Sequence, residues 1–365
     1  MTALLVIAIL VFLIVAHELG HFIVAKLFRL RVEEFGIGYP PRAFLFMVRG
    51  GTAYTVNWFP FGGFVRLFGD DTSEEVPNNK KDRFRDAPRA VQITVLFGGV
   101  VFNVIVAWAL LSGALVLGIP RQVSSTEEGV SARLILSSVV DGSPAFLAGL
   151  REGDTILSLE SEGSRIESKV LPEDVSVFIS SHGGKEVTVT YARGDSKEET
   201  VVRPAHAVLS EESGRAAIGV ALALVTDGAL SVPRAMKESV YRTFAMGRAV
   251  VGGLWSIIDG ARKGEPTLKN LIGPVGLVGA VSHVTERGVG NVLAFAAFIS
   301  INLAIINLIP IPALDGGRVA LIVCETLMRR RMPHMVLMFA NVLGMLLIAL
   351  LLVVVTYQDV VRLLM

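Results

Sequence analysis

Four long apolar stretches set the pattern of hydrophobic and polar positions along this chain. They cover about residues 3–25, 91–118, 293–327 and 335–356, and the third contains a proline break. Each is long enough for the ~20 residues that cross a bilayer as a helix. The first has no basic n-region and no small-residue cleavage site, so we interpret it as a span and not as a removed signal peptide. The pattern therefore predicts a polytopic α-helical membrane protein with about four transmembrane helices.

The segments between the spans predict three further elements. Residues 52–67 are aromatic, partly alternating and glycine-rich, which is typical of a membrane-associated β-hairpin. Such a hairpin either offers a strand edge to an extended peptide or simply anchors on the lipid surface. Residues 121–206 alternate strand-like runs with polar turns, as in one compact soluble module. Residues 232–259 mix apolar and basic positions at helical spacing, which indicates an amphipathic helix lying on the membrane.

These elements divide the chain into four parts. The N-terminal membrane part, residues 1–120, carries the first two spans and the predicted hairpin. The inserted module covers 121–206, and a linker with the amphipathic helix covers 207–292. The C-terminal membrane part covers 293–365 and holds the remaining apolar stretches.

The distribution of charged residues predicts how the chain is oriented across the membrane and limits the classes of partner that it could bind. Basic residues gather after the first span and again at residues 329–331. Because cytoplasmic loops carry an excess of Lys and Arg, both clusters belong inside, which puts the N-terminus, residues 121–292 and the C-terminus outside. Lysine and arginine number 34 against 33 acids, so no basic excess indicates nucleic acid as a partner. Cys324 is the only cysteine, which excludes an internal disulfide and a cysteine-based zinc site.

Candidate chemistry begins inside the first span, at His17-Glu18-Leu19-Gly20-His21. On a helix, His17 and His21 are four residues apart and share a face, so both rings can bind one zinc ion, with Glu18 as general base. The alternative is a pair of histidines hydrogen-bonded inside a helical bundle. Ionisable groups within an apolar span are costly and are by default functional, and three occur here within five residues.

A catalytic zinc ion needs three protein ligands and one open position, so a third ligand must be found. Asp315 stands out among the other apolar segments, because it follows Pro310 and Pro312, which break regular helix. Irregular backbone at membrane depth is tolerated where it is buried in protein or lines a wet cavity. We therefore predict one Zn²⁺ ion held by His17, His21 and Asp315. The alternative for Asp315 is a loop at a helix end.

Together the two motifs resemble the site-2 protease family of intramembrane zinc metalloproteases, most closely its bacterial RseP type. The resemblance rests on His17 to His21 and on Asn307-x-x-Pro310-x-Pro312-x-Leu314-Asp315-Gly316, and it covers essentially the whole chain. It implies a multi-pass protein of the bacterial cell (inner) membrane that cleaves transmembrane segments in regulated intramembrane proteolysis. Anti-sigma factors and remnant signal peptides are typical substrates.

The resemblance also implies roles for three asparagines. Asn302 and Asn307 would help to hold the substrate backbone or its developing oxyanion, with helix-to-helix hydrogen bonding as the alternative. In the family, a glycine-rich segment that contains an asparagine packs beside the site, and residues 97–103 match it, ending at Asn103. A tie between helices is the alternative for Asn103. Residues 273–277 match a further family element, and His283 beyond it is interpreted as a non-ligand.

The inserted module resembles a PDZ domain, since residues 143–159 have the order short helix, Gly-Asp turn and strand. Such a module either binds a peptide end by strand addition or acts as a steric filter over the membrane site. RseP-like enzymes can carry two PDZ domains in tandem, whereas this stretch has room for one, which argues against a two-module mechanism.

These observations favour a zinc metalloendopeptidase over two alternatives. Zinc would lower the pKa of a bound water and polarise the scissile carbonyl, while Glu18 would carry the water proton to the leaving nitrogen. The first alternative, a non-catalytic membrane scaffold that binds exported proteins through its PDZ domain, is disfavoured because Glu18 is retained. The second, a zinc hydrolase acting on lipid or a small molecule, has only the metal motif in its favour. The expected partners are transmembrane or signal-peptide substrates and the lipid bilayer.

Overall fold

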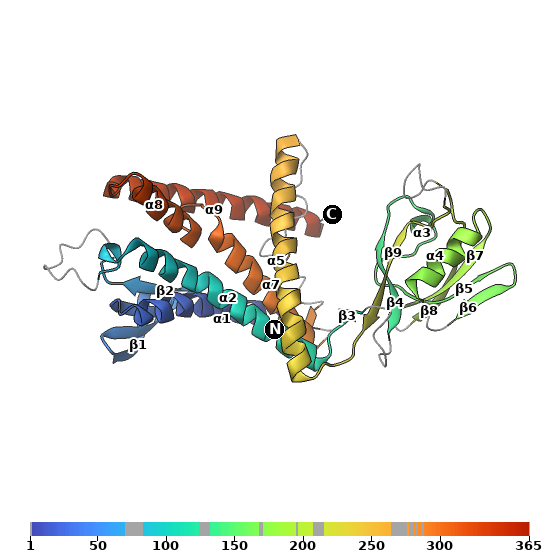
Figure 1. Ribbon diagram of the computed structural model, residues 1–365, viewed down its shortest axis with the longest axis horizontal. Coiled ribbons are helices and arrows are strands. Elements are labelled where there is room, and N and C mark those ends of the chain that lie inside the picture. Colours follow the sequence, from blue (N-terminus) through green and yellow to red (C-terminus); the bar gives the residue numbers. More distant parts are fainter. Residues whose placement is uncertain are drawn as a thin grey trace. The chain divides into compact units, whose positions relative to one another are not determined.

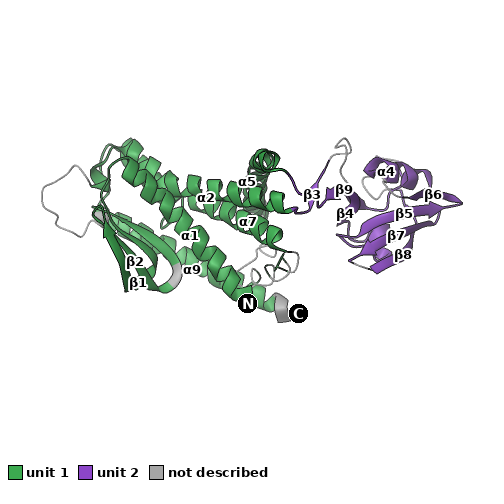
Figure 2. Ribbon diagram, turned by 90° about the horizontal axis from the view of Figure 1, so that it is seen from below, with its two compact units in different colours: residues 1–117, 231–365 green, residues 118–230 purple. Residues whose placement is uncertain are grey.

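The computed structural model describes residues 2–69, 83–123, 132–167, 171–194, 196–206, 215–263 and 288–364, together with residues 276, 281, 284 and 285. Two compact units make up the chain, as the two colours of Figure 2 show. Unit 1 comprises residues 1–117 and 231–365, and unit 2 comprises residues 118–230. His283 and most of the 273–277 motif lie outside the described residues.

Unit 1 contains four helices that are long and apolar enough to cross a membrane, within the part of the chain that is described. They are α1 (Thr2–Leu27), α2 (Arg89–Leu117), α7 (Val289–Leu308) and α9 (His334–Leu364). Their positions agree with the four apolar stretches of the sequence, except at the third. There the helix ends at Leu308, and a separate short helix, α8 (Asp315–Leu327), begins after the prolines. Proline lacks an amide hydrogen and clashes with the preceding turn, so the break splits the predicted 293–327 stretch into two helices.

Helices α1 and α2 approach each other closely at a pair of glycines. A methyl group on Gly98 would lie 2.8 Å from the carbonyl oxygen of Gly20, which is too near for any side chain. Small residues at such crossings let helix backbones pack in direct contact. This contact brings α2 against the face of α1 that carries the two histidines.

Between α1 and α2, the strands β1 (Val32–Arg49) and β2 (Thr52–Leu67) pair to form one sheet. Both strands bend, so four segments lie side by side in the order 44–49, 52–57, 34–37 and 63–67. Gly50 and Gly51 join the first two with φ values of 58° and 76°, the left-handed conformation that a two-residue hairpin turn needs. The sequence had predicted a hairpin from residues 52–67 alone, whereas the structure pairs them with β1.

Helix α5 (Val232–Lys263) packs on α2 and α7 within unit 1. Trp108 of α2 donates from Nε1 to the Met236 carbonyl at 3.0 Å, and the hydroxyls of Ser112 and Ser239 are 2.7 Å apart. Figures 1 and 2 show α5 running across α2 and α7, not along them. Helix α5 covers the segment 232–259, for which a helix was predicted.

In its described residues, unit 2 has one antiparallel sheet of seven strands and two helices. The strand order is β3-β9-β4-β5-β7-β8, and β6 pairs with β5. The elements are β3 (Arg121–Gln122), β4 (Arg133–Val139), α3 (Pro144–Leu147), β5 (Thr155–Ser161), β6 (Ser164–Glu167), α4 (Pro172–Ser181), β7 (Val187–Arg193), β8 (Ser196–Val202) and β9 (Val220–Thr226).

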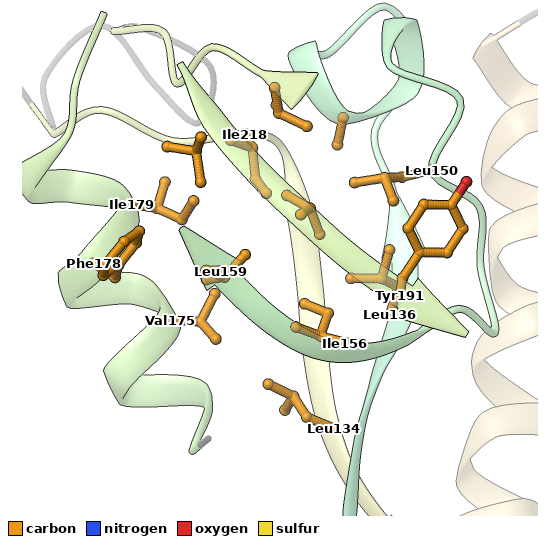
Figure 3. Close-up of a cluster of buried hydrophobic side chains, with 14 of the residues drawn as sticks. Leu134, Leu136, Leu150, Ile156, Leu159, Val175, Phe178, Ile179, Tyr191 and Ile218 are labelled. Carbon is orange, nitrogen blue, oxygen red and sulfur yellow. The ribbon is translucent and has the colours of Figure 1, made fainter. Parts of the chain in front are cut away.

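The core of unit 2 lies between α4 and the sheet, as Figure 3 shows. Val175, Phe178 and Ile179 of α4 point toward Leu159 of β5 in this cluster. At one end of the sheet, Arg193 donates to both oxygens of the buried Asp154 at 2.8 Å, and that carboxylate raises the pKa of Arg193.

Unit 2 extends further than the 121–206 module expected from the sequence. Strand β9 lies inside the sheet, between β3 and β4, although its residues fall in the predicted linker 207–292. The cause is non-local pairing. A short apolar run such as Val220 to Val225 does not reveal its partner strands in its own pattern.

Candidate metal centre

The three predicted ligands come together although Asp315 is 298 residues from His17. One ligand atom each from His17, His21 and Asp315 can be chosen so that all lie within 4.8 Å of one another. Asp315 Oδ2 is 2.9 Å from His17 Nε2 and 3.3 Å from His21 Nε2, and the two Nε2 atoms are 3.1 Å apart. Both histidines are buried and Asp315 is half-buried.

Packing at the ends of the helices explains this convergence. Ile322 of α8 belongs to an apolar cluster with Ala25 of α1 and with Val95 and Leu96 of α2. The cluster fixes α8 against the other two helices and places its first residue, Asp315, opposite the histidines. His21 is six residues from the end of α1, or ~9 Å of helix. The centre therefore lies nearer the C-terminal end of α1 than its N-terminal end.

The residues present fit a zinc ion. Two imidazole nitrogens and one carboxylate form a ligand set of catalytic zinc sites, in which a fourth position stays open for water or substrate. Gly99 of α2 forms part of the wall, and a methyl group there would lie 2.6 Å from Nε2 of both His17 and His21. Any larger residue at this position would occupy the space where the two nitrogens meet.

The partners of the remaining ring nitrogens set the tautomers that metal binding needs. His21 Nδ1 lies 2.9 Å from the Val95 carbonyl, so Nδ1–H donates there and the lone pair of Nε2 faces the site. Asn103 Nδ2 lies 3.2 Å from His17 Nδ1. The other amide atom, Asn103 Oδ1, is buried without a hydrogen-bond partner in the described part of the chain. Turning this amide by half a turn lets Oδ1 accept from His17 Nδ1–H. His17 Nε2 is then also free to bind metal.

Asn103 also joins two helices, because Ser300 of α7 donates to its backbone carbonyl at 2.8 Å. The contacts thus match both sequence-based interpretations of this residue, a place beside the site and a tie between helices. Val95 acts through its backbone, so no side-chain pattern could have indicated it. Gly99 and Asn103 stood within the glycine-rich stretch that the sequence did single out.

The structure separates the two asparagines of α7. Asn307 Nδ2 lies 3.3 Å from His17 Nε2, and Asn307 and Asp315 together line a small cavity of about 50 Å³. Asn302 instead donates to the Phe298 carbonyl of its own helix at 2.8 Å. Five residues correspond to ~140° around a helix, so the two side chains point in different directions. Asn307 belongs to the site, whereas the contacts of Asn302 are those of a helix surface.

Glu18 lies between the metal ligands and the sheet. Its carboxylate lies near the backbone amide of Val65 in β2, and a methyl group on Gly63 would lie 3.3 Å from Glu18 Cγ. Segment 63–67 is an edge of the sheet, because no other described strand pairs on its outer side. Since Gly63 and Val65 both lie beside Glu18, this segment faces the candidate general base.

Sequence similarity to known proteins covers almost the whole chain. The family model described as Peptidase family M50 matches residues 5–351. A relative in Clostridium perfringens is 31% identical over 351 residues, covering 96% of this chain and 95% of the relative. The regulator of sigma-W protease RasP of Bacillus subtilis is 27% identical over 428 positions, covering 96% of each chain.

Among solved structures, the PDZ domain of an SdrC-like protein from Listeria monocytogenes matches 27% of this chain and 93% of that domain. The identity is 28% and the TM-score is 0.20.

Proposed function

The chain belongs to peptidase family M50 and is a membrane metalloprotease, and from this we propose that it is a zinc-dependent intramembrane endopeptidase. Its substrates would be membrane-spanning segments or remnant signal peptides of membrane proteins. The observation that carries the proposal is the convergence of His17, His21 and Asp315 inside a group of apolar helices, with Glu18 beside them.

His17 and His21 would hold one zinc ion through Nε2, and Asp315 would hold it through a carboxylate oxygen. When bound, the zinc ion acts as a Lewis acid and lowers the pKa of a water molecule at its open coordination position. Glu18 takes the proton of the attacking water and delivers it to the leaving nitrogen. The Asn307 amide, 3.3 Å from His17 Nε2, is placed to donate to the oxyanion that develops on the scissile carbonyl.

The edge segment 63–67 would hold the substrate. A helix hides its carbonyls in hydrogen bonds, so a spanning substrate must unwind before water can attack. An extended peptide paired with the free edge would run directly past Glu18, because Val65 faces it. The same sheet also suits a lipid-anchoring role, because three of its aromatic side chains are exposed. Phe44, Phe46 and Trp58 are exposed by 60%, 67% and 71%.

We place the protein in a bacterial inner membrane, with unit 2 outside the cytoplasm. The support is the excess of basic residues near the α1 end and the α8–α9 junction, which belongs on the cytoplasmic side. Unit 2 would act as a PDZ-like module that binds peptide or excludes bulky substrates. No observation favours the non-catalytic scaffold over the enzyme.

Substrate trapping in native membranes tests the proposal. Glu18→Gln should keep the fold and the metal ligands but lose the general base, so uncut membrane proteins should accumulate with the variant and be identified after its purification. Glu152→Gln, the same change at an exposed position of unit 2, is the matched control and should trap nothing. Normal processing by the Glu18→Gln variant would reject the assignment.

A further inference from the structure

Glu34 of β1 is a buried carboxylate within the sheet of unit 1, with 6% of its surface exposed. Its Oε1 atom accepts a hydrogen bond from the Thr55 hydroxyl at 2.7 Å and another from Arg42 at 3.0 Å. Its Oε2 atom lies 3.6 Å from Nη1 of Arg66, which is longer than a hydrogen bond. The carboxylate is therefore bound mainly by Arg42 and Thr55, and Arg66 has only the longer contact.

One carboxylate thus faces two guanidinium groups, so these three side chains carry a formal charge of +1. Arg42 and Arg66 have side chains that are 50% and 51% exposed, which leaves the surplus positive charge accessible to a ligand. Within the described part of the chain, Glu34 is the only acidic side chain that pairs with either arginine. The Arg66 guanidinium also lies 5.8 Å from the centre of the Phe64 ring, a contact that restricts where it points.

Arg66 stands on the edge segment 63–67, beside which the substrate is proposed to lie. Gly63 of this segment lies against Glu18, and the three residues from Gly63 to Arg66 span ~10 Å of extended strand. Arg66 pairs with Glu34 on its inner side, and no other described strand pairs on its outer side. A peptide strand added there would place one residue directly opposite Arg66, with its side chain on the same face of the sheet.

The position of Arg66 also suits a charged partner. The next residue, Leu67, belongs to the apolar cluster that contains Ala25, two residues before the end of α1. Arg66 therefore lies near the end of a span, and its half-exposed guanidinium can reach water. A charged substrate residue opposite it would not have to lie in the middle of the hydrocarbon, where ionised groups are costly.

We propose that Arg66 is a specificity-determining residue, which selects substrates with an acidic side chain within about three residues of the bond that is cut. This inference rests on the proposed function, because it takes the substrate to be an extended peptide on segment 63–67. A carboxylate opposite Arg66 forms an opposite-charge pair across the two strands, which stabilises their pairing. A lysine at the same place faces a like charge, which weakens the pairing.

A series of substrates tests this selection on the unmodified enzyme. In an otherwise identical single-span substrate, one position at a time on either side of the cut is changed to Glu, Gln or Lys. The value of kcat/KM is measured in a neutral detergent, so that no anionic lipid headgroup competes for Arg66. At a position within about three residues of the cut, the Glu substrate should be cleaved about threefold to tenfold faster than the Lys substrate, with Gln between them.

Charge reversal identifies the residue responsible. Arg66→Glu should invert the order at that position, and Arg66→Gln should make the three substrates equal within about twofold. Arg49→Glu makes the same change at an exposed position on the far edge of the sheet and should keep the original preference. Each preference is a ratio of rates within one variant, so a general loss of activity does not imitate the effect. Arg66→Gln also carries the test if the reversed variant fails to fold.

Two results would overturn the selection by Arg66 while leaving the proposed function in place. One is cleavage of the Glu, Gln and Lys substrates at equal rates by the unmodified enzyme at every position. The other is a preference for Glu that survives Arg66→Glu. A purified, zinc-containing enzyme that cuts none of the substrates would instead contradict the proposed function, and this inference with it.

Discussion

Gly99 of α2 lies so close to the candidate metal ligands that the site leaves no room for a side chain there. A methyl group there would sit 2.6 Å from both ligating nitrogens, whereas one on Gly113 of the same helix would sit 3.4 Å from a Leu293 methyl, an ordinary contact. Gly99→Ala should therefore reduce zinc content and lower the rate of cleavage by at least about tenfold, the effect expected of a disturbed ligand shell. Gly113→Ala makes the same chemical change and should retain both. Equal behaviour of the two variants would show that Gly99 does not shape the site.

The ligands themselves are tested by metal content. Because two imidazoles and one carboxylate converge, the purified protein should contain one zinc per chain, and the His17→Ala, His21→Ala double variant should contain almost none. Elemental analysis after gel filtration measures this. The Glu18→Gln variant is the control, since it should keep its zinc while losing activity. Full zinc in the double variant would contradict the ligand assignment.

At the scale of single residues, the candidate ligands could be selected from the sequence because each carries a local signal. His17 and His21 are placed together by one helical turn, and Asp315 is marked by the prolines before it. The residues that orient the ligands were harder to predict. Asn103 was noted without a defined contact, and the Val95 carbonyl has no signal in the sequence because its role depends on how α2 packs against α1.

Among the elements, the edge segment 63–67 makes the clearest functional prediction. Proline lacks an amide hydrogen, so Val65→Pro removes a backbone donor of this edge segment beside Glu18 and should slow cleavage of a spanning substrate several-fold. Phe46→Pro places proline in segment 44–49, the far edge of the sheet, and should have a smaller effect. Initial rates in liposomes compare the two. Equal rates would remove the reason for assigning segment 63–67 a clamping role.

A clamping role for segment 63–67 also requires the substrate helix to unwind. Replacing Gly or Pro with Leu inside a cleaved segment, at unchanged hydrophobic length, should slow cleavage because the helix becomes harder to open. Matched substrates that differ only at this position give the comparison. Equal initial rates for helix-stabilised and helix-broken segments would show that unwinding is not limiting.

The extent of this sheet was predicted only in part. Residues 52–67 alternate and are aromatic, so they were recognised as strand, but residues 32–49 were not. Their register includes several irregularities, and the strand bends between its segments 34–37 and 44–49, which disrupts the alternation on which a strand prediction depends. Strand β9 was missed as part of unit 2 for a related reason, since its partners β3 and β4 lie far away in the sequence.

At the scale of the whole molecule, the division into two units predicts that catalysis and selection are separable. None of the proposed catalytic groups lies in residues 118–230, so replacing this unit with a flexible linker should leave peptide-bond cleavage intact while changing which substrates are accepted. The excision should include β9, because removing 123–206 alone would leave that strand without its neighbour β4. Rates on a panel of substrates measure the effect. A folded, zinc-containing deletion variant that cuts nothing would contradict the separation.

The most direct measurement is the position of the cut in a reconstituted system. A single-span substrate is placed in liposomes with the purified enzyme, and mass spectrometry of the products locates the broken bond. We predict a cut within the apolar segment that is lost on zinc chelation, restored by added zinc and absent with Glu18→Gln. A cut confined to residues outside the membrane, or the same cut made by a zinc-containing Glu18→Gln variant, would contradict intramembrane proteolysis at this centre.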